Sequence, residues 1–152
     1  MASIENKMRI VFESRSENEG FARVVAAAFI LGLDPTLEEM NDFKTAVSEA
    51  VTNCIIHAYD GKVGEIVMEI TTVVYEDVID GNRACVMSKI MDTGCGIVDI
   101  EKAMEPLYTS RPEEERSGMG FAFMEAFMDE LRCESVLNNG TTIYMKKYIK
   151  AN

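Results

Sequence analysis

The chain has 152 residues, 47% of them hydrophobic, which suffices for one compact domain (1–152) with its own core. Its formal net charge of -11 argues against direct nucleic-acid binding, because domains that bind polyanions carry a basic face. The start lacks the basic and apolar regions of a signal peptide, and no apolar stretch reaches the roughly 18 residues that span a bilayer. We therefore expect a cytoplasmic protein without membrane contact.

The N-terminal third predicts a strand and two helices. Residues 8–12 predict the strand, and Ser16 with Glu19 has the spacing of a capping box for a helix that runs to about Leu33. Thr36 with Glu39 predicts a second capping box and a long second helix after the break at Asp34-Pro35. A helical wheel of that second helix gives one apolar face: Met40, Phe43, Val47, Val51, Cys54 and Ala58.

The rest of the chain predicts two hairpins and one more helix. β-branched residues predict strands over 64–75 and 83–92, joined by a turn at Asp80-Gly81. Residues 121–131 predict an apolar helix. A closing hairpin is expected from strands at 132–137 and 141–149, flanking Asn138-Asn139-Gly140. The expected fold is an α/β (α+β) two-layer sandwich, with helices on one face of a mixed, mostly antiparallel sheet.

Two further features bear on function class. The four cysteines never form a Cys-x-x-Cys pair, which favours reduced and mostly buried thiols over a zinc site or a disulfide framework. Residues 109–118, "TSRPEEERSG", have the composition of a surface loop.

Polar residues interrupt the second helix at a spacing of four. Glu49, Asn53 and His57 form a stripe at the edge of the apolar face, where a helix borders a cleft. A solvated polar face would give the same pattern, and His57 also suits a structural cap near a helix end. The stripe alone therefore leaves both interpretations open.

Two glycine pairs add to the stripe. Asp92 ends an apolar strand and is followed by Gly94 and Gly96, which let a flat ligand approach the backbone while the carboxylate accepts from an exocyclic amine. Gly118 and Gly120 directly precede an apolar helix, whose free N–H groups could hold phosphates. An ordinary glycine-rich turn and a flexible hinge are the respective alternatives.

Together and in this order, the three features resemble the nucleotide-binding boxes of the GHKL (Bergerat-fold) ATPases. Within that superfamily the chain is similar to the sporulation anti-sigma F factors, a family of small serine kinases. The segments that carry this resemblance are "FARVVAAAFI", "LDPT", "TAVSEAVTNCIIHAY", "EPLYTSRPEEERSGMGFAFMEAFMD" and "GTTI".

The resemblance implies ATP/ADP and Mg²⁺ as ligands and assigns roles to individual residues. It makes Glu49 the general base of phosphoryl transfer, Asn53 the side-chain ligand of Mg²⁺, and Arg116 a contact of the γ-phosphate. For adenine it implies Asp92, Gly94, Gly96 and Thr142, and for the phosphate and lid region it implies Thr109, Ser110, Ser117, Gly118, Met119 and Gly120.

The same resemblance implies partners. A sigma factor and an anti-anti-sigma factor with a phosphorylatable serine would compete for a surface that includes Arg23, and the protein would be a homodimer. Three alternatives stay open: a detached catalytic domain of a histidine kinase, a binding module that uses ATP only to fix its shape, and a switch-type anti-sigma factor with another sigma partner. No phosphoacceptor segment precedes the domain, which argues against the first, and Glu49 argues against the second.

Overall fold

A five-stranded sheet organises the computed structural model, which describes residues 3–105 and 120–152. The strands are β1 (Ile4–Glu13), β2 (Glu65–Ile79), β3 (Asn82–Asp92), β4 (Glu130–Val136) and β5 (Gly140–Lys150). Their order across the sheet is β1-β2-β3-β5-β4, and every neighbouring pair among the described strands is antiparallel. The sheet is thus antiparallel throughout, which corrects the expectation of a mixed sheet, while the two-layer fold is confirmed.

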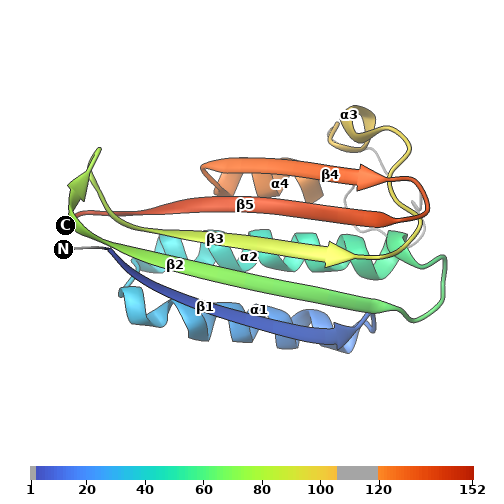
Figure 1. Ribbon diagram of the computed structural model, residues 1–152, viewed down its shortest axis with the longest axis horizontal. Coiled ribbons are helices and arrows are strands. Elements are labelled where there is room, and N and C mark those ends of the chain that lie inside the picture. Colours follow the sequence, from blue (N-terminus) through green and yellow to red (C-terminus); the bar gives the residue numbers. More distant parts are fainter. Residues whose placement is uncertain (1–2, 106–119) are drawn as a thin grey trace.

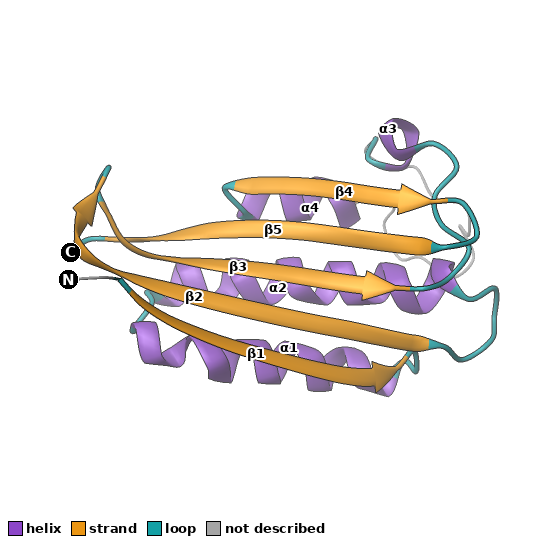
Figure 2. Cartoon of the chain, viewed as in Figure 1, coloured by secondary structure: helices purple, strands orange, loops and turns teal. Residues whose placement is uncertain are grey.

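The helices form the second layer. They are α1 (Glu17–Ile30), α2 (Leu37–Asn53), α3 (Ile100–Ala103) and α4 (Gly120–Phe127), with a 3₁₀ turn at Leu31–Leu33 and a π-helical turn at Cys54–Ala58. Figures 1 and 2 show α1, α2 and α4 together behind one face of the sheet, and α3 beyond the end where β3 and β4 finish. No helix in the described part of the chain is both long and apolar enough to cross a membrane.

The two predicted capping boxes have different outcomes. Thr36 caps α2 as expected, with its side chain accepting from the Glu39 N–H and the Glu39 carboxylate accepting from the Thr36 N–H. Ser16 makes no side-chain cap at α1, so that prediction is wrong. Glu19 instead accepts a hydrogen bond from the Ser48 hydroxyl of α2, because a partner on the neighbouring helix replaces the local one.

The core lies between the helices and the inward face of the sheet. Of the predicted apolar face of α2, all but the half-buried Met40 are buried. They pack against inward side chains of the three central strands, including Ile66, Met68, Ile90 and Ile143. The cysteines form no disulfide: Cys54 and Cys85 are buried, Cys133 is half-buried and Cys95 is exposed.

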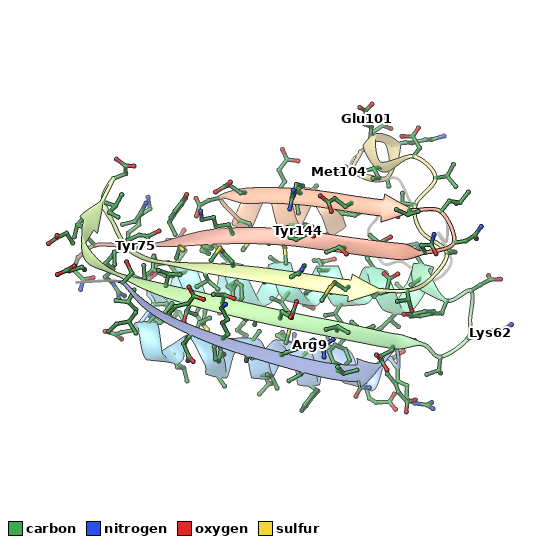
Figure 3. All side chains as sticks on the ribbon, viewed as in Figure 1. Arg9, Lys62, Tyr75, Glu101, Met104 and Tyr144 are labelled. Atoms are coloured by element: carbon green, nitrogen blue, oxygen red, sulfur yellow. The ribbon has the colours of Figure 1, made fainter. Side chains whose placement is uncertain are left out.

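None of the described helices covers the opposite face of the sheet. A row of paired residues crosses all five strands there, from Arg9 through Glu69 and Lys89 to Tyr144 and Arg132. Arg132 lies 4.1 Å from the centre of the Tyr144 ring, a cation–π contact. Figure 3 shows Arg9 and Tyr144 on this uncovered face, remote from the helix layer that holds the predicted site.

Candidate functional site

The structure brings one member of the second glycine pair against the polar stripe of α2. Glu49 and Asn53 are half-buried, and Gly120, the first residue of α4, is buried beside them. A Cβ placed on Gly120 would lie 3.2 Å from Glu49 Oε2 and 3.4 Å from Asn53 Oδ1. Glu49 and Asn53 therefore face the Gly120 end of α4, so this part of the stripe is not simply a solvated face.

The π-helical turn after Asn53 connects α2 to the first glycine pair. The Ala58 carbonyl accepts from the Cys95 N–H at 2.7 Å, and the His57 carbonyl accepts from the Cys95 thiol at 3.2 Å. Gly94 lies so close that a Cβ there would be 2.0 Å from the Ala58 oxygen. The predicted glycine is thus required by contact with the helix end, and His57 serves this loop through its backbone.

Asp92 is the centre of the first glycine box. It is 8% exposed, and its Oδ1 accepts from the Gly94 N–H at 3.0 Å and the Thr141 N–H at 3.2 Å. Burial raises the pKa of the Asp92 carboxyl, and hydrogen bonds from Gly94, the Cys54 thiol and Thr141 oppose part of that shift. Burial also raises the pKa of Cys54, which keeps the thiol protonated as a donor to Asp92.

Residues from β5 complete the surroundings of Asp92, but not the one that was predicted. Thr141 is buried on the helix side of β5, whereas Thr142 is half-buried on the opposite face, since successive strand residues point to opposite sides. The predicted Thr142 therefore points away from Asp92, and it is Thr141 that contacts the Asp92 carboxylate. Thr141 and the apolar Ile143 are two residues apart on the strand and therefore point to the same face. This spacing is the sequence signal that identifies Thr141 as inward-facing.

Tyr59 is a positioning residue that the sequence analysis missed. Its hydroxyl accepts from the Thr93 N–H at 2.9 Å and donates to the Glu65 carbonyl at the start of β2. The Tyr59 ring also fills the space beside Gly64, where a Cβ would clash with it. Tyr59 thus joins the end of α2 to the residue that follows Asp92, a tertiary contact that no local pattern reveals.

A cleft of about 980 Å³ opens on another side of Glu49. Its lining includes Glu19 and Arg23 of α1, Thr52 of α2, and Lys62 from the loop after the π-helical turn. Lys62 lies on the loop that projects beyond the end of the sheet in Figure 3. Glu49 therefore belongs both to the wall of an open cleft and to the contact with Gly120.

Several predicted residues cannot be placed. Those outside the described part of the chain are Thr109, Ser110, Arg116, Ser117, Gly118 and Met119. Gly96 can be placed: it adopts φ +78°, and a Cβ on it would lie 2.6 Å from the Val136 carbonyl oxygen. The first glycine box thus packs against the β4–β5 hairpin as well as against α2.

The donor set beside Gly120 fits Mg²⁺ held jointly with phosphates. Asn53 offers an amide oxygen and Glu49 a carboxylate, both hard oxygen donors. Among residues 3–105 and 120–152, no cluster of three or more His, Cys, Asp or Glu side chains is arranged to hold a metal. Mg²⁺ in phosphoryl-transfer sites typically has only one or two protein ligands, with waters and phosphate oxygens supplying the rest, so one amide oxygen is compatible with such a site.

Comparison with known proteins defines the class. The family model described as "Histidine kinase-like ATPase domain" matches residues 12–147, nearly the whole chain. The fold agrees: the RsbU and RsbW domains of a Mycobacterium tuberculosis protein superpose with TM-score 0.64 at 16% identity, over 97% of this chain and 33% of that one. The mycobacterial sensor histidine kinase MprB gives TM-score 0.51 at 20% identity, over 74% of each chain. The protein is thus an ATPase-type domain of the GHKL class.

Sequence relatives narrow the class to one family. Anti-sigma F factors from Clostridium acetobutylicum and Thermoanaerobacter pseudethanolicus are 56% and 54% identical, each over 95% of this chain and 94% of the relative. The anti-sigma F factor of Geobacillus kaustophilus is 51% identical over 96% of this chain and 94% of its own. The chain belongs to the anti-sigma F factor family.

Proposed function

We propose that the protein is an ATP-dependent anti-sigma factor that sequesters a sporulation sigma factor and phosphorylates a serine of its anti-anti-sigma factor. The observation that carries the proposal is the double position of Glu49, which contacts Gly120 on one side and lines the cleft with Arg23 on another. A carboxylate in that position can meet a serine hydroxyl from a docked protein and a triphosphate from the glycine side.

In the proposed reaction Glu49 is the general base. The serine oxygen attacks the γ-phosphorus, Glu49 takes the hydroxyl proton, and the bond to the β-phosphate oxygen breaks to release ADP. Asn53 would supply the protein ligand for Mg²⁺, which would neutralise charge on the phosphates when bound. Asp92, Gly94 and Gly96 would hold adenine, Gly118 and Gly120 the phosphates, and Arg116 the γ-phosphate.

The cleft supports docking of a protein on the α1 side. Arg23 lies 3.9 Å from Glu19 and is partly exposed, so its guanidinium is available to a partner carboxylate at the rim of the cleft. Both the sigma factor and the anti-anti-sigma factor would use this rim, which makes their binding mutually exclusive.

A different surface supports a homodimer. The edge strand β1 and helix α1 carry exposed apolar residues, namely Val11, Phe21 and Val24, and a second copy of the chain could cover them.

The test is transfer of label from γ-labelled ATP with magnesium to a candidate anti-anti-sigma protein. Replacing Glu49 with Gln should lower the transfer rate at least about a hundredfold, because an amide cannot accept the proton, while the Kd for ATP changes by less than about threefold. Glu38→Gln, on the exposed side of the same helix, is the matched control and should transfer label at the wild-type rate.

The identity of the labelled residue separates the alternatives. Phosphoserine supports the proposal, and phosphohistidine would instead indicate a histidine kinase. ATP binding without any transfer would leave a module that uses nucleotide only for its conformation. Unchanged transfer by the Glu49→Gln protein would refute the role of Glu49.

A further inference from the structure

Two charged residues are buried in the part of the chain that the structure describes. One is Asp92, in the adenine site, and the other is Lys147, which is 9% exposed and has no part in the proposed chemistry. Lys147 lies on the inward face of β5, which otherwise carries residues without charge: Thr141, Ile143, Met145 and Ile149. A lysine among them interrupts the apolar pattern of a core strand, and lysines are rarely buried unless their charge is paired.

The Lys147 ammonium joins three elements. Its Nζ donates to the carbonyl of Phe127, the last residue of α4, at 2.9 Å. The same Nζ lies 3.6 Å from Oδ2 of Asp42 on α2, with the Lys147 side chain 11% and the Asp42 side chain 25% exposed. Lys147 therefore caps the C-terminal end of α4 and ties that end to the first half of α2.

These contacts fix the direction of α4 along α2. The C-terminal end of α4 lies at Asp42, and its first residue, Gly120, lies at Glu49 and Asn53, so the two helices run antiparallel. A short helix held at one end can shift along its neighbour only if that attachment yields. Lys147 thus holds the end of α4 opposite to Gly120, while Phe121 and Met124 of the same helix pack in the core.

Packing alone does not call for a charge at this place. Burying an ion pair usually gives no more stability than apolar side chains of similar volume, because both charges must be desolvated. A methionine would fill the same volume within a core that already contains Met124 and Met145. What the ammonium adds is a directional bond to one carbonyl and one carboxylate, which specifies a single position of α4.

We propose that Lys147, together with Asp42, is a positioning residue that holds the first turn of α4 at the phosphate side of the nucleotide site. This inference rests on the proposed function, because it assumes that ATP phosphates bind beside Gly120. The proposal predicts different effects on phosphate binding and on base binding. Displacement of α4 should weaken contacts to the β- and γ-phosphates and leave the base pocket around Asp92 unchanged.

The experiment compares MgATP with AMP, using isothermal titration for MgATP and competition against it for AMP. In the Lys147→Met protein we expect the Kd for MgATP to rise at least about tenfold, since small displacements of positioning groups have large effects. The Kd for AMP should change less than about twofold. Lys146→Met is the matched control: this neighbouring lysine faces the opposite side of the sheet, pairs with Glu130, and should leave both Kd values at wild-type levels.

The ratio of the two Kd values decides the outcome, because a general loss of structure would weaken ATP and AMP together. Equal weakening of both, or an unchanged ratio, overturns the positioning role. If Lys147→Met does not fold, Asp42→Asn gives the same test. It removes the charged partner of Lys147 and should also raise the ratio of the Kd for MgATP to the Kd for AMP. A wild-type protein that binds no ATP would refute the proposed function itself, a different result from either of these.

Discussion

At the scale of single residues, the buried carboxylate of Asp92, proposed to bind adenine, lowers the stability of the folded protein. Its carboxyl is buried, and desolvation raises its pKa above the ordinary 3.8 despite three hydrogen bonds that favour the charged form. Between the unfolded and the folded pKa, the native state holds a proton that the unfolded state has lost. Stability therefore falls as the pH rises through that interval and stays lower above it.

Replacing Asp92 with Asn should separate the two effects. The amide oxygen can still accept from the Gly94 and Thr141 N–H groups, and the buried charge is gone. We expect the free energy of unfolding to rise by about 1 kcal/mol at pH 7, and the gain to shrink as the pH is lowered toward 4. Urea unfolding at a series of pH values measures this, and a gain that does not depend on pH would contradict the assignment.

The same substitution should weaken nucleotide binding. An amide in place of the carboxylate removes the charged acceptor proposed for the adenine amine, so the Kd for ATP should rise at least about tenfold. Isothermal titration measures it on the protein used for unfolding. A more stable protein with wild-type ATP affinity would show that adenine is held elsewhere.

At the scale of elements, the end of α2 organises the site. The helix gives Glu49 and Asn53 from its last α-helical turns, and the π-helical turn then presents the Ala58 carbonyl to the Cys95 N–H. π-helical turns are rare and occur frequently at functional sites. Tyr59 then ties this helix end to Thr93, so one continuous segment positions residues on both the proposed phosphate side and the proposed base side.

Removal of the Tyr59 hydroxyl tests that connection. In Tyr59→Phe the Thr93 N–H loses its acceptor, and we expect about 1–2 kcal/mol lower stability in urea unfolding. AMP and ATP should lose affinity by the same factor, because the base side is displaced. Tyr144→Phe, whose hydroxyl lies 3.4 Å from Glu134 on the uncovered face of the sheet, is the control and should change neither quantity. A larger loss for ATP than for AMP would assign Tyr59 to the phosphate side.

At the scale of the whole molecule, the sheet has two edge strands, β1 and β4, and the β1 edge carries exposed apolar residues. Strand β1 is at the edge of the sheet, and α1 lies behind it in Figure 1, so β1 backbone groups and exposed α1 side chains share one border of the protein. Val24 on α1 is 64% exposed there. A second copy of the chain placed on this border would remove the apolar residues from water and cover the strand edge.

A charge at this border should weaken the proposed dimer. We expect Val24→Asp to raise the dimer dissociation constant at least about tenfold, because a desolvated carboxylate would face an apolar partner. Light scattering after size-exclusion chromatography over a range of concentrations measures it. Val78→Asp, a substitution at a valine of similar exposure on the β2–β3 hairpin, is the control and should not alter the mass. A Val24→Asp protein with unchanged mass would place the dimer elsewhere.

The sequence by itself determined what short-range patterns encode. Alternation placed the strands, the Thr36 cap and the turn at Asp80-Gly81 follow from local chemistry, and the spacing of four on α2 selected Glu49 and Asn53. Neither glycine box identifies a class by its spacing alone; the class was predicted from the resemblance of the stripe and both boxes, in this order, to the nucleotide-binding boxes of the GHKL ATPases.

Only the tertiary structure decided which of these groups meet. The approach of Gly120 to Glu49, the contact of Gly94 with Ala58, and the attachment of α4 by Lys147 all join residues far apart in the chain. Glu19 illustrates the reason: its local spacing predicted a cap with Ser16, but the fold supplied Ser48 as a partner. Individual side-chain contacts are worth about 1 kcal/mol, so the partner that packing brings near prevails over the one that sequence spacing suggests.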